Sequence, residues 1–152
     1  MNFDLNFKEN LHRYCVALVQ EKLAMLQQQI NARKNDLESA SKSSAGDKHE
    51  TARAMIHLEQ EKLGMQFMDV EKQRNLLSQI VVSTYSTIQS GTLIITDKAI
   101  FYISVGLGKV LFNEQDIYVI SPVSPLAQAF LYSKSLETIV FQSSTYNIIS
   151  IS

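Results

Sequence analysis

Two acidic residues at the start of a helix-forming segment are the candidate chemistry of this chain. Asp47 and Glu50 lie in the run Gly46-Asp47-Lys48-His49-Glu50. Because residues three apart on a helix share one face, we expect the two carboxylates to project together, with their Cβ atoms about 5–6 Å apart. Proteins commonly hold Mg²⁺ with one or two carboxylates, while waters and phosphates complete its octahedron. The pair therefore predicts a weak Mg²⁺ site that a second molecule completes.

The same spacing also has a purely structural explanation. An aspartate at a helix start followed three residues later by a glutamate is typical of a capping arrangement, in which both side chains bond backbone amides. Both negative charges are also favoured by the positive end of the helix dipole. Spacing alone favours capping for Asp47 and Glu50. The two roles are compatible, because a capping carboxylate keeps a free oxygen.

Other arrangements of catalytic residues fail on their spacing. The run from His49 to Arg53 begins like the helix of a zinc protease, but Arg53 stands where the second histidine ligand belongs. The remaining histidines have no ligand spacing and no cysteine pair to join, so we expect surface histidines at His12, His49 and His57. No phosphate-binding glycine loop or nucleophile triad can be assembled. We therefore expect no self-contained active site, and we predict that the chain is not itself an enzyme.

The first eighty residues are predicted to form two long helices. This half is rich in Gln, Glu, Lys, Leu and Met, which favour helix, and it contains no proline. Its apolar residues recur in steps of three, four and seven, which is typical of two facing helices. The first seam contains Leu11, Leu18, Leu23, Leu26, Ile30, Arg33 and Leu37. The second contains Ile56, Leu63, Val70 and Leu77, with Met55, Phe67 and Met68 widening the stripe.

A small polar segment separates the two helices. Residues 39–47 are rich in serine, continue no seam and have the chemistry of a turn. The helices should therefore fold back on each other as an antiparallel coiled-coil hairpin over residues 1–80, with its tip near 40–50. Each arm of about 30 residues would extend about 45 Å. This length suits a hairpin that is built to reach, and the pattern alone equally allows an ordinary helical hairpin packed against another element.

The second half, residues 81–152, is predicted to be a separate small domain. Val, Ile, Thr, Tyr and Phe recur in short runs between turn residues, which favours strands. A short amphipathic helix is expected at 124–131, with a capping serine followed by proline. The fold class is thus α+β, a mostly antiparallel sheet carrying one short helix. The expected strands are Val81–Ile88, Thr92–Thr96, Ile100–Val105, Lys109–Phe112, Ile117–Ile120, Glu137–Gln142 and Tyr146–Ile151.

Composition excludes several function classes. Fourteen basic residues balance fifteen acidic ones, so no global field would draw the chain onto nucleic acid or an anionic membrane. The single cysteine, Cys15, stands among apolar helix residues and is expected to be a buried thiol. The absence of a membrane-length apolar stretch or a signal-peptide pattern at the N-terminus predicts a cytoplasmic protein.

Two short motifs stand in the two halves of the chain. The first is Gly46-Asp47-x-x-Glu50 followed by Ala52, and the second begins Ser124-Pro125-Leu126-Ala127 and ends at Lys134. Together they resemble motifs of the Gre family, the GreA and GreB transcript cleavage factors of bacterial RNA polymerase. The first looks like the acidic tip motif of that family, and the second is similar to a motif in its C-terminal, FKBP-like domain. The order of the motifs, their separation and the total length all agree with the family, so the resemblance covers nearly the whole chain.

The resemblance implies a function through a partner. The FKBP-like domain would dock at the rim of the polymerase secondary channel, with Ser124, Pro125 and Leu126 as partner-binding residues. The coiled coil would pass inward, so that Asp47 and Glu50 help the polymerase hold a second Mg²⁺ and cut backtracked RNA. The resemblance thus implies RNA polymerase as the partner, Mg²⁺ shared with it, no cofactor bound alone, and indirect contact with nascent RNA. It implies neither membrane binding nor sequence-specific DNA binding.

Three alternatives stay open. His49 and Thr51 replace the serine and asparagine usual in the tip motif, and positive charges crowd the tip at Lys42, Lys48 and Arg53. These departures suit a secondary-channel regulator of transcription that does not cleave RNA. The FKBP-like fold alternatively suggests a peptidyl-prolyl isomerase. The hairpin alone would suit a coiled-coil adaptor with no link to polymerase.

Overall fold

The chain divides into two compact units. The computed structural model describes residues 3–42 and 47–152, without the side chains of Ser41 and residues 47–49. Contacts group Ala17–Arg74 into one unit, which we call the hairpin unit, and Met1–Val16 with Asn75–Ser152 into another, the sheet unit. The sheet unit therefore includes both the first sixteen residues and residues 75–80. The division into independent domains at residue 80 stays a prediction.

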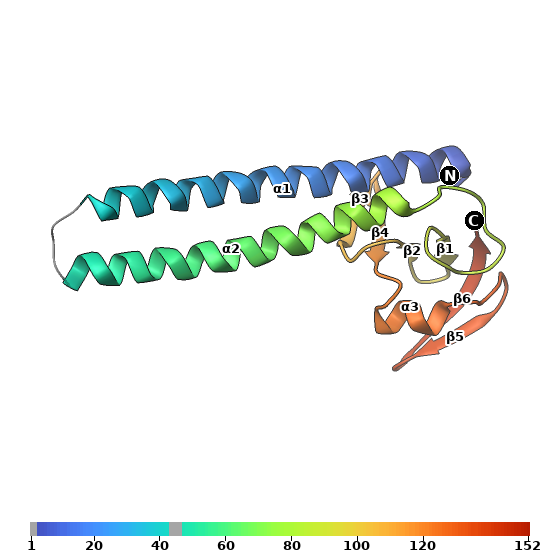
Figure 1. The fold of residues 1–152 in the computed structure, drawn as a ribbon. Coiled ribbons are helices and arrows are strands. Elements are labelled where there is room, and N and C mark those ends of the chain that lie inside the picture. Colours follow the sequence, from blue (N-terminus) through green and yellow to red (C-terminus); the bar gives the residue numbers. More distant parts are fainter. Residues whose placement is uncertain (1–2, 43–46) are drawn as a thin grey trace. The chain divides into compact units, whose positions relative to one another are not determined.

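Two long helices confirm the predicted helical half. Helix α1 spans Leu5–Ser41 and α2 spans Asp47–Gln79. Within the hairpin unit they run side by side in opposite directions (Figure 1). The side chain of Asp4 caps α1, because its Oδ1 accepts a hydrogen bond of 2.9 Å from the backbone N–H of Phe7. No described helix is long and apolar enough to cross a membrane.

The apolar seam between the helices follows the predicted heptads. In α1, Leu23 and Leu26 are buried, and the next seam positions toward the turn are half-buried. In α2, Val70 is buried and Phe67 is half-buried. Burial of one apolar stripe on each helix stabilises the pair. The half-buried positions are Ile30, Arg33, Leu37, Ile56, Leu63 and Phe67.

The prediction that two methionines widen the α2 seam is wrong. Met55 is 66% exposed and Met68 is 60% exposed. At 100° per residue, Met68 lies on the outward side of α2, away from the stripe that contains Leu63 and Val70, whereas Met55 lies at the edge of that stripe. Leu58 and Met65, 66% and 64% exposed, lie on the same outward side. The outer face of α2 is thus unusually apolar for an exposed helix surface.

A mixed six-stranded sheet forms the centre of the sheet unit. Its strand order is β3-β4-β2-β1-β6-β5 (Figure 1). Of the pairings between described strands, β2 with β4 is parallel and the others are antiparallel, so the predicted, mostly antiparallel sheet is confirmed. The strands are β1 Leu93–Thr96, β2 Ile100–Ile103, β3 Gly108–Phe112, β4 Gln115–Ile120, β5 Thr138–Phe141 and β6 Ser144–Ile151.

One short helix closes the core of the sheet unit, as predicted. Helix α3 spans Pro125–Phe130 and buries Ala127 and Phe130. Phe130 packs on Phe101 of β2 and Tyr146 of β6, with ring centroids 5.3 and 5.5 Å away. Such tilted and edge-on contacts between aromatic rings add to the stabilisation from burial alone. The described structure is therefore α+β, in agreement with the sequence, while the closer likeness to FKBP stays a prediction.

The predicted strand Val81–Ile88 is wrong, because this segment is an irregular connection between α2 and β1. Its composition suits a strand, but its polar groups bond to side chains and to another connection. The carbonyl of Ser83 accepts from Lys8 Nζ at 2.6 Å, and that of Val81 accepts from the Tyr85 hydroxyl at 2.6 Å. The N–H of Ile88 donates to the Ser133 carbonyl at 2.9 Å.

A β-bulge begins the hairpin formed by β5 and β6. The N–H of Leu136 donates to the carbonyl of Ile148, whose own N–H donates to the carbonyl of Glu137, both at 2.9 Å. Leu136 and Glu137 thus both lie opposite Ile148, and Leu136 has a φ of 70°. Glycine is the usual residue there, since a Cβ is strained in this conformation. Leu136 is 86% exposed, so its side chain gains little from burial in return.

Leu136→Gly is expected to stabilise the protein. Relief of the left-handed strain outweighs the added freedom of the unfolded chain, so the free energy of unfolding should rise by roughly 0.5–1 kcal/mol. Urea denaturation followed by circular dichroism measures the change. Leu136→Ala keeps the Cβ and should bring no gain. An equal gain from Leu136→Ala would show that removal of the exposed leucine, and not relief of strain, is responsible.

Candidate functional site at the hairpin turn

The candidate carboxylates lie at the end of the hairpin where α2 begins. Asp47 is the first residue of α2, and Glu50 follows it by about one helical turn. The side chain of Glu50 is exposed, whereas that of Asp47 lies outside the described residues. The predicted pairing of the two carboxylates therefore stays a prediction, while the helical backbone that sets their three-residue spacing is present.

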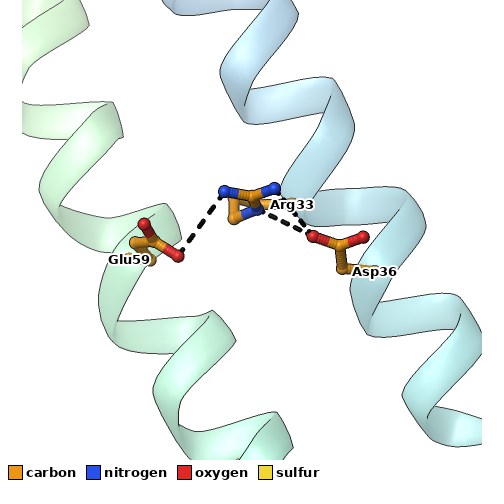
Figure 2. Close-up of polar contacts among 3 residues, drawn as sticks. All are labelled: Arg33, Asp36 and Glu59. Atoms are coloured by element: carbon orange, nitrogen blue, oxygen red, sulfur yellow. Dashed lines mark hydrogen bonds and ion pairs between the residues drawn. The ribbon is translucent and has the colours of Figure 1, made fainter.

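A polar link crosses the hairpin within the seam. Arg33 Nε donates to Asp36 Oδ2 on the same helix at 2.9 Å, and its Nη1 lies 3.7 Å from Glu59 Oε2 on the other helix (Figure 2). The Arg33 side chain is 31% exposed. An ion pair this accessible contributes at most about 1 kcal/mol. Its position explains how the apolar seam accommodates an arginine, and it helps fix the register of the two helices.

The chemistry available at this end of the hairpin is that of an incomplete cation site. Glu50 is exposed near the helix N-terminus, and Lys42 at the end of the first arm is also exposed. Among the described side chains, no three His, Cys, Asp or Glu residues come together to hold a metal ion. A lone carboxylate or a pair holds Mg²⁺ weakly in water. Ligands from a second molecule would be needed to fix a cation here.

The second predicted site, Ser124 to Leu126, forms the start of α3. Ser124 Oγ caps the helix, accepting from the Ala127 N–H at 3.3 Å and donating to the Ser121 carbonyl at 2.7 Å. Pro125 occupies the first turn and is exposed, while Leu126 is half-buried against the core. Ser124 and Leu126 thus have structural roles, and the side chain of Pro125 is accessible to a partner.

A cleft of about 450 Å³ borders this block. Its rim carries exposed apolar side chains, with Val123 80% exposed and Val81 69% exposed. Ser104 Oγ is buried in its wall with no hydrogen-bond partner among the described residues. The cleft can accept a mainly apolar group. It is lined by Leu76, Gln79, Ile80, Val81, Tyr85, Ser90, Ser104, Ser121, Pro122 and Val123.

Sequence reasoning missed a buried lysine near this cleft. Lys8 on α1 is fully buried, and its Nζ donates to the carbonyls of Ser83 and Gly91 at 2.6 and 3.0 Å. The ammonium also lies 5.0 Å from the centroid of the Tyr85 ring, and burial lowers the pKa of Lys8 to about 8. Its place three residues before Leu11, on the buried stripe of α1, was the signal available in the sequence.

The prediction that His12 is a surface residue is wrong. His12 is half-buried, and its Nδ1 lies 2.7 Å from the hydroxyl of buried Tyr102. Burial lowers the pKa of His12, with a smaller opposite effect from the backbone of Leu77. In the tautomer that carries its proton on Nε2, the neutral ring accepts a hydrogen bond at Nδ1 from the Tyr102 hydroxyl. His57 is exposed as predicted, and the side chain of His49 lies outside the described residues.

The depressed pKa of His12 makes stability dependent on pH. Below the unfolded-state pKa of 6.5, the unfolded chain binds this proton more readily, so stability falls as pH drops through the folded-state pKa. His12→Gln, which still accepts from Tyr102 but cannot titrate, should flatten this part of the curve. Urea denaturation between pH 7.5 and pH 5 measures it, with His57→Gln as the control. Parallel curves for wild type and His12→Gln would contradict the assignment.

The predicted buried thiol is confirmed. Cys15 is fully buried on α1, and burial raises its pKa to about 12. The thiolate, which is the reactive form, is therefore scarce at neutral pH. The native cysteine should not react with oxidants or thiol reagents while the protein is folded.

Comparisons with known proteins give structural likeness and no sequence relative. No family of proteins matches the chain, and no curated protein matches it. Among solved structures, it is similar to GreA factor homolog 1 (Gfh1) of Thermus thermophilus, at 14% identity and a TM-score of 0.37, over 90% of this chain and 94% of that one. A second structure of the transcription factor Gfh1 matches at 13% identity and a TM-score of 0.37, over 90% of this chain and 92% of that one. Gfh1 of Thermus aquaticus matches at 12% identity and a TM-score of 0.37, over 91% of this chain and 94% of that one.

Proposed function

We propose that this chain is a Gre-like transcription factor that binds RNA polymerase and inserts its helical hairpin into the secondary channel. The observation that carries the proposal is Glu50, exposed in the first turns of α2 and three residues from Asp47 at the turn end of an antiparallel hairpin. The α2 segment of the hairpin unit extends about 40 Å at 1.5 Å per residue. A rod of that length carries carboxylates into a deep cavity of a larger protein.

The proposed chemistry is shared with the polymerase. Asp47 and Glu50 would supply oxygen ligands for a Mg²⁺ ion shared with the polymerase. In two-metal sites such an ion stabilises charge and activates the attacking water. The chain then acts as an accessory factor, with no active site of its own, and the polymerase cleaves the backtracked RNA. A net charge of −1 is consistent with contact to RNA through the polymerase alone.

The sheet unit supplies the proposed docking surface. Pro125 is exposed at the start of α3, and the adjoining cleft is bordered by exposed Val123 and Val81. An apolar cleft beside an exposed proline suits an apolar anchor from a protein partner. Ser124 and Leu126 hold the helix start in place, so in this proposal they position the surface, while Pro125 contacts the polymerase.

The test is an RNA cleavage assay with bacterial RNA polymerase. Purified chain is added with Mg²⁺ to an elongation complex stalled in a backtracked register, and the RNA length is followed over time. The proposal expects shortened RNA at a rate that increases with the concentration of the chain. Binding to the polymerase is measured in parallel by fluorescence anisotropy. Neither binding nor shortening, with polymerase that responds to a known cleavage factor, would exclude the proposal.

A second candidate is a channel regulator that does not cleave RNA. It is favoured by the exposed Lys42 and half-buried Arg53 near the hairpin turn, whose positive charge competes with a cation for the carboxylates. This candidate predicts binding to polymerase, competition with a known secondary-channel ligand, and altered initiation with RNA of unchanged length. Binding to polymerase without such competition would exclude it.

A further inference from the structure

The two edges of the six-stranded sheet differ in how they are protected. At one edge, β3 carries an exposed lysine, Lys109. The ring centroids of Phe7 and Tyr14 on α1 lie 5.4 and 5.3 Å from the ring centroid of Phe112 on β3. A charge and a covering segment are common devices against pairing with another chain. The other edge, β5, has the sequence Thr-Ile-Val-Phe and carries neither charge nor proline. Val140 on this strand is 66% exposed.

The hydrogen-bond pattern shows which backbone groups of β5 are free. The bond from the Ile148 N–H to the Glu137 carbonyl marks that pair as hydrogen-bonded. Because such pairs alternate along an antiparallel ladder, Ile139 and Phe141 also direct their backbone groups toward β6. Thr138 and Val140 therefore direct their N–H and C=O groups away from β6. Since β5 ends the strand order, no other described strand bonds this side.

The free edge is short and its ends are fixed. The bulge at Leu136 and Glu137 ends the regular ladder on one side, and the turn at residues 142–143 ends it on the other. One face of the strand is already in use, since Ile139 packs against the core. What remains is a four-residue backbone edge with Thr138 and Val140 on the opposite face. Its occupant must be an extended strand without charge at its centre.

We propose that this edge pairs with β5 of a second copy of the chain, antiparallel and about a two-fold axis at Ile139. In this register Thr138 lies opposite Val140 of the other copy, and each of these two pairs exchanges two backbone hydrogen bonds. All outward N–H and C=O groups of Thr138 and Val140 are thereby satisfied. Residues 138–141 carry no charge, so two copies of this strand can pair without electrostatic repulsion. The two sheets become continuous across the interface.

The expected dimer is weak. A four-residue edge buries much less surface than a stable homodimer needs, so we expect a dissociation constant on the order of 10⁻⁴ M. Sedimentation equilibrium of the full chain over a wide concentration range measures it. The proposal is independent of polymerase binding, and the experiment contains no polymerase. A chain that stays monomeric up to about ten times that concentration would overturn it.

Charge variants locate the interface. Val140→Lys places an ammonium on the free edge of each copy, which should weaken dimerisation at least about tenfold. Leu111→Lys is the matched control, because Leu111 is 65% exposed on the opposite edge strand and the charge change is the same. Circular dichroism shows whether each variant is folded. Equal weakening by both variants, or by neither, would place any dimer elsewhere and overturn the proposal.

Disulfide formation tests the proposed interface without introducing a charge into the strand. Ile139→Cys puts two thiols opposite each other at the two-fold axis, at a spacing that suits a disulfide in a non-hydrogen-bonded pair. Diamide takes up the two electrons and two protons released as the S–S bond forms. Native Cys15 is buried and should not react. Thr145→Cys, exposed on β6, is the control. Covalent dimer from Ile139→Cys and not from Thr145→Cys is expected, and the reverse would contradict the register.

Discussion

Asp47→Ala combined with Glu50→Ala is expected to abolish stimulated RNA cleavage while polymerase binding persists. The two carboxylates are proposed to hold Mg²⁺ only in the complex, so their loss removes a metal ligand set without removing the docking surface. Loss of one stabilising interaction with developing charge commonly costs a hundredfold or more, so the cleavage rate should fall by at least about a hundredfold. Single-turnover cleavage of a backtracked complex measures it.

A matched control separates this effect from a change in charge. Glu61→Ala combined with Asp69→Ala removes two exposed carboxylates from the same helix, farther from the turn. This variant should cleave at the wild-type rate. Asp47→Asn with Glu50→Gln tests the ligands while it keeps the side-chain size, and it should behave like the alanine pair. Wild-type cleavage by both tip variants would exclude a catalytic role for these residues.

Lys8→Met is expected to destabilise the sheet unit strongly. The methionine fills a similar volume, but the carbonyls of Ser83 and Gly91 lose the donor that now bonds both. A buried acceptor left without a partner costs about 1–3 kcal/mol, so the free energy of unfolding should fall by about 3 kcal/mol. The residues after α2 should also become more accessible to protease.

Thermal and urea denaturation measure the loss, and limited proteolysis followed by mass spectrometry locates it. Lys72→Met is the control, because Lys72 is exposed on α2 and the chemical change is the same. It should change stability by no more than about 0.5 kcal/mol. If Lys8→Met were as stable as Lys72→Met, the bonds from Lys8 would contribute nothing net, as occurs for some buried ions that can be replaced by apolar groups.

Local sequence signals predicted the elements whose partners are close in the chain. The heptads of Leu23, Leu26 and Val70 predicted the hairpin because each helix presents one apolar stripe. Ser124 and Pro125 predicted the start of α3 because capping depends on neighbouring residues. The parallel pairing of β2 with β4 has no such local signal, since it depends on how β3 returns the chain.

Long-range partners account for what the sequence did not predict. Residues 81–88 have the composition of a strand, yet Lys8, 75 residues away from Ser83, bonds this connection. The residues around His12 predict a surface position, because its partner Tyr102 lies 90 positions later in the sequence. Met55 and Met68 were assigned to the seam from their neighbours, yet both are exposed, because Met68 lies on the outward side of α2 and Met55 at the edge of the stripe. For the candidate site, the sequence predicted Asp47 and Glu50, and the structure adds the exposure of Glu50.

The exposed methionines of α2 can report, through their oxidation, whether the hairpin is enclosed by another protein. Met55, Met65 and Met68 are each at least 60% exposed. Accessible thioethers are converted to sulfoxides by dilute peroxide, and each added oxygen is visible by mass spectrometry of the peptides. A hairpin enclosed by another protein would be shielded from the reagent, whereas a free one would be oxidised along its length. The unaltered chain can thus record, residue by residue, how deeply it is inserted.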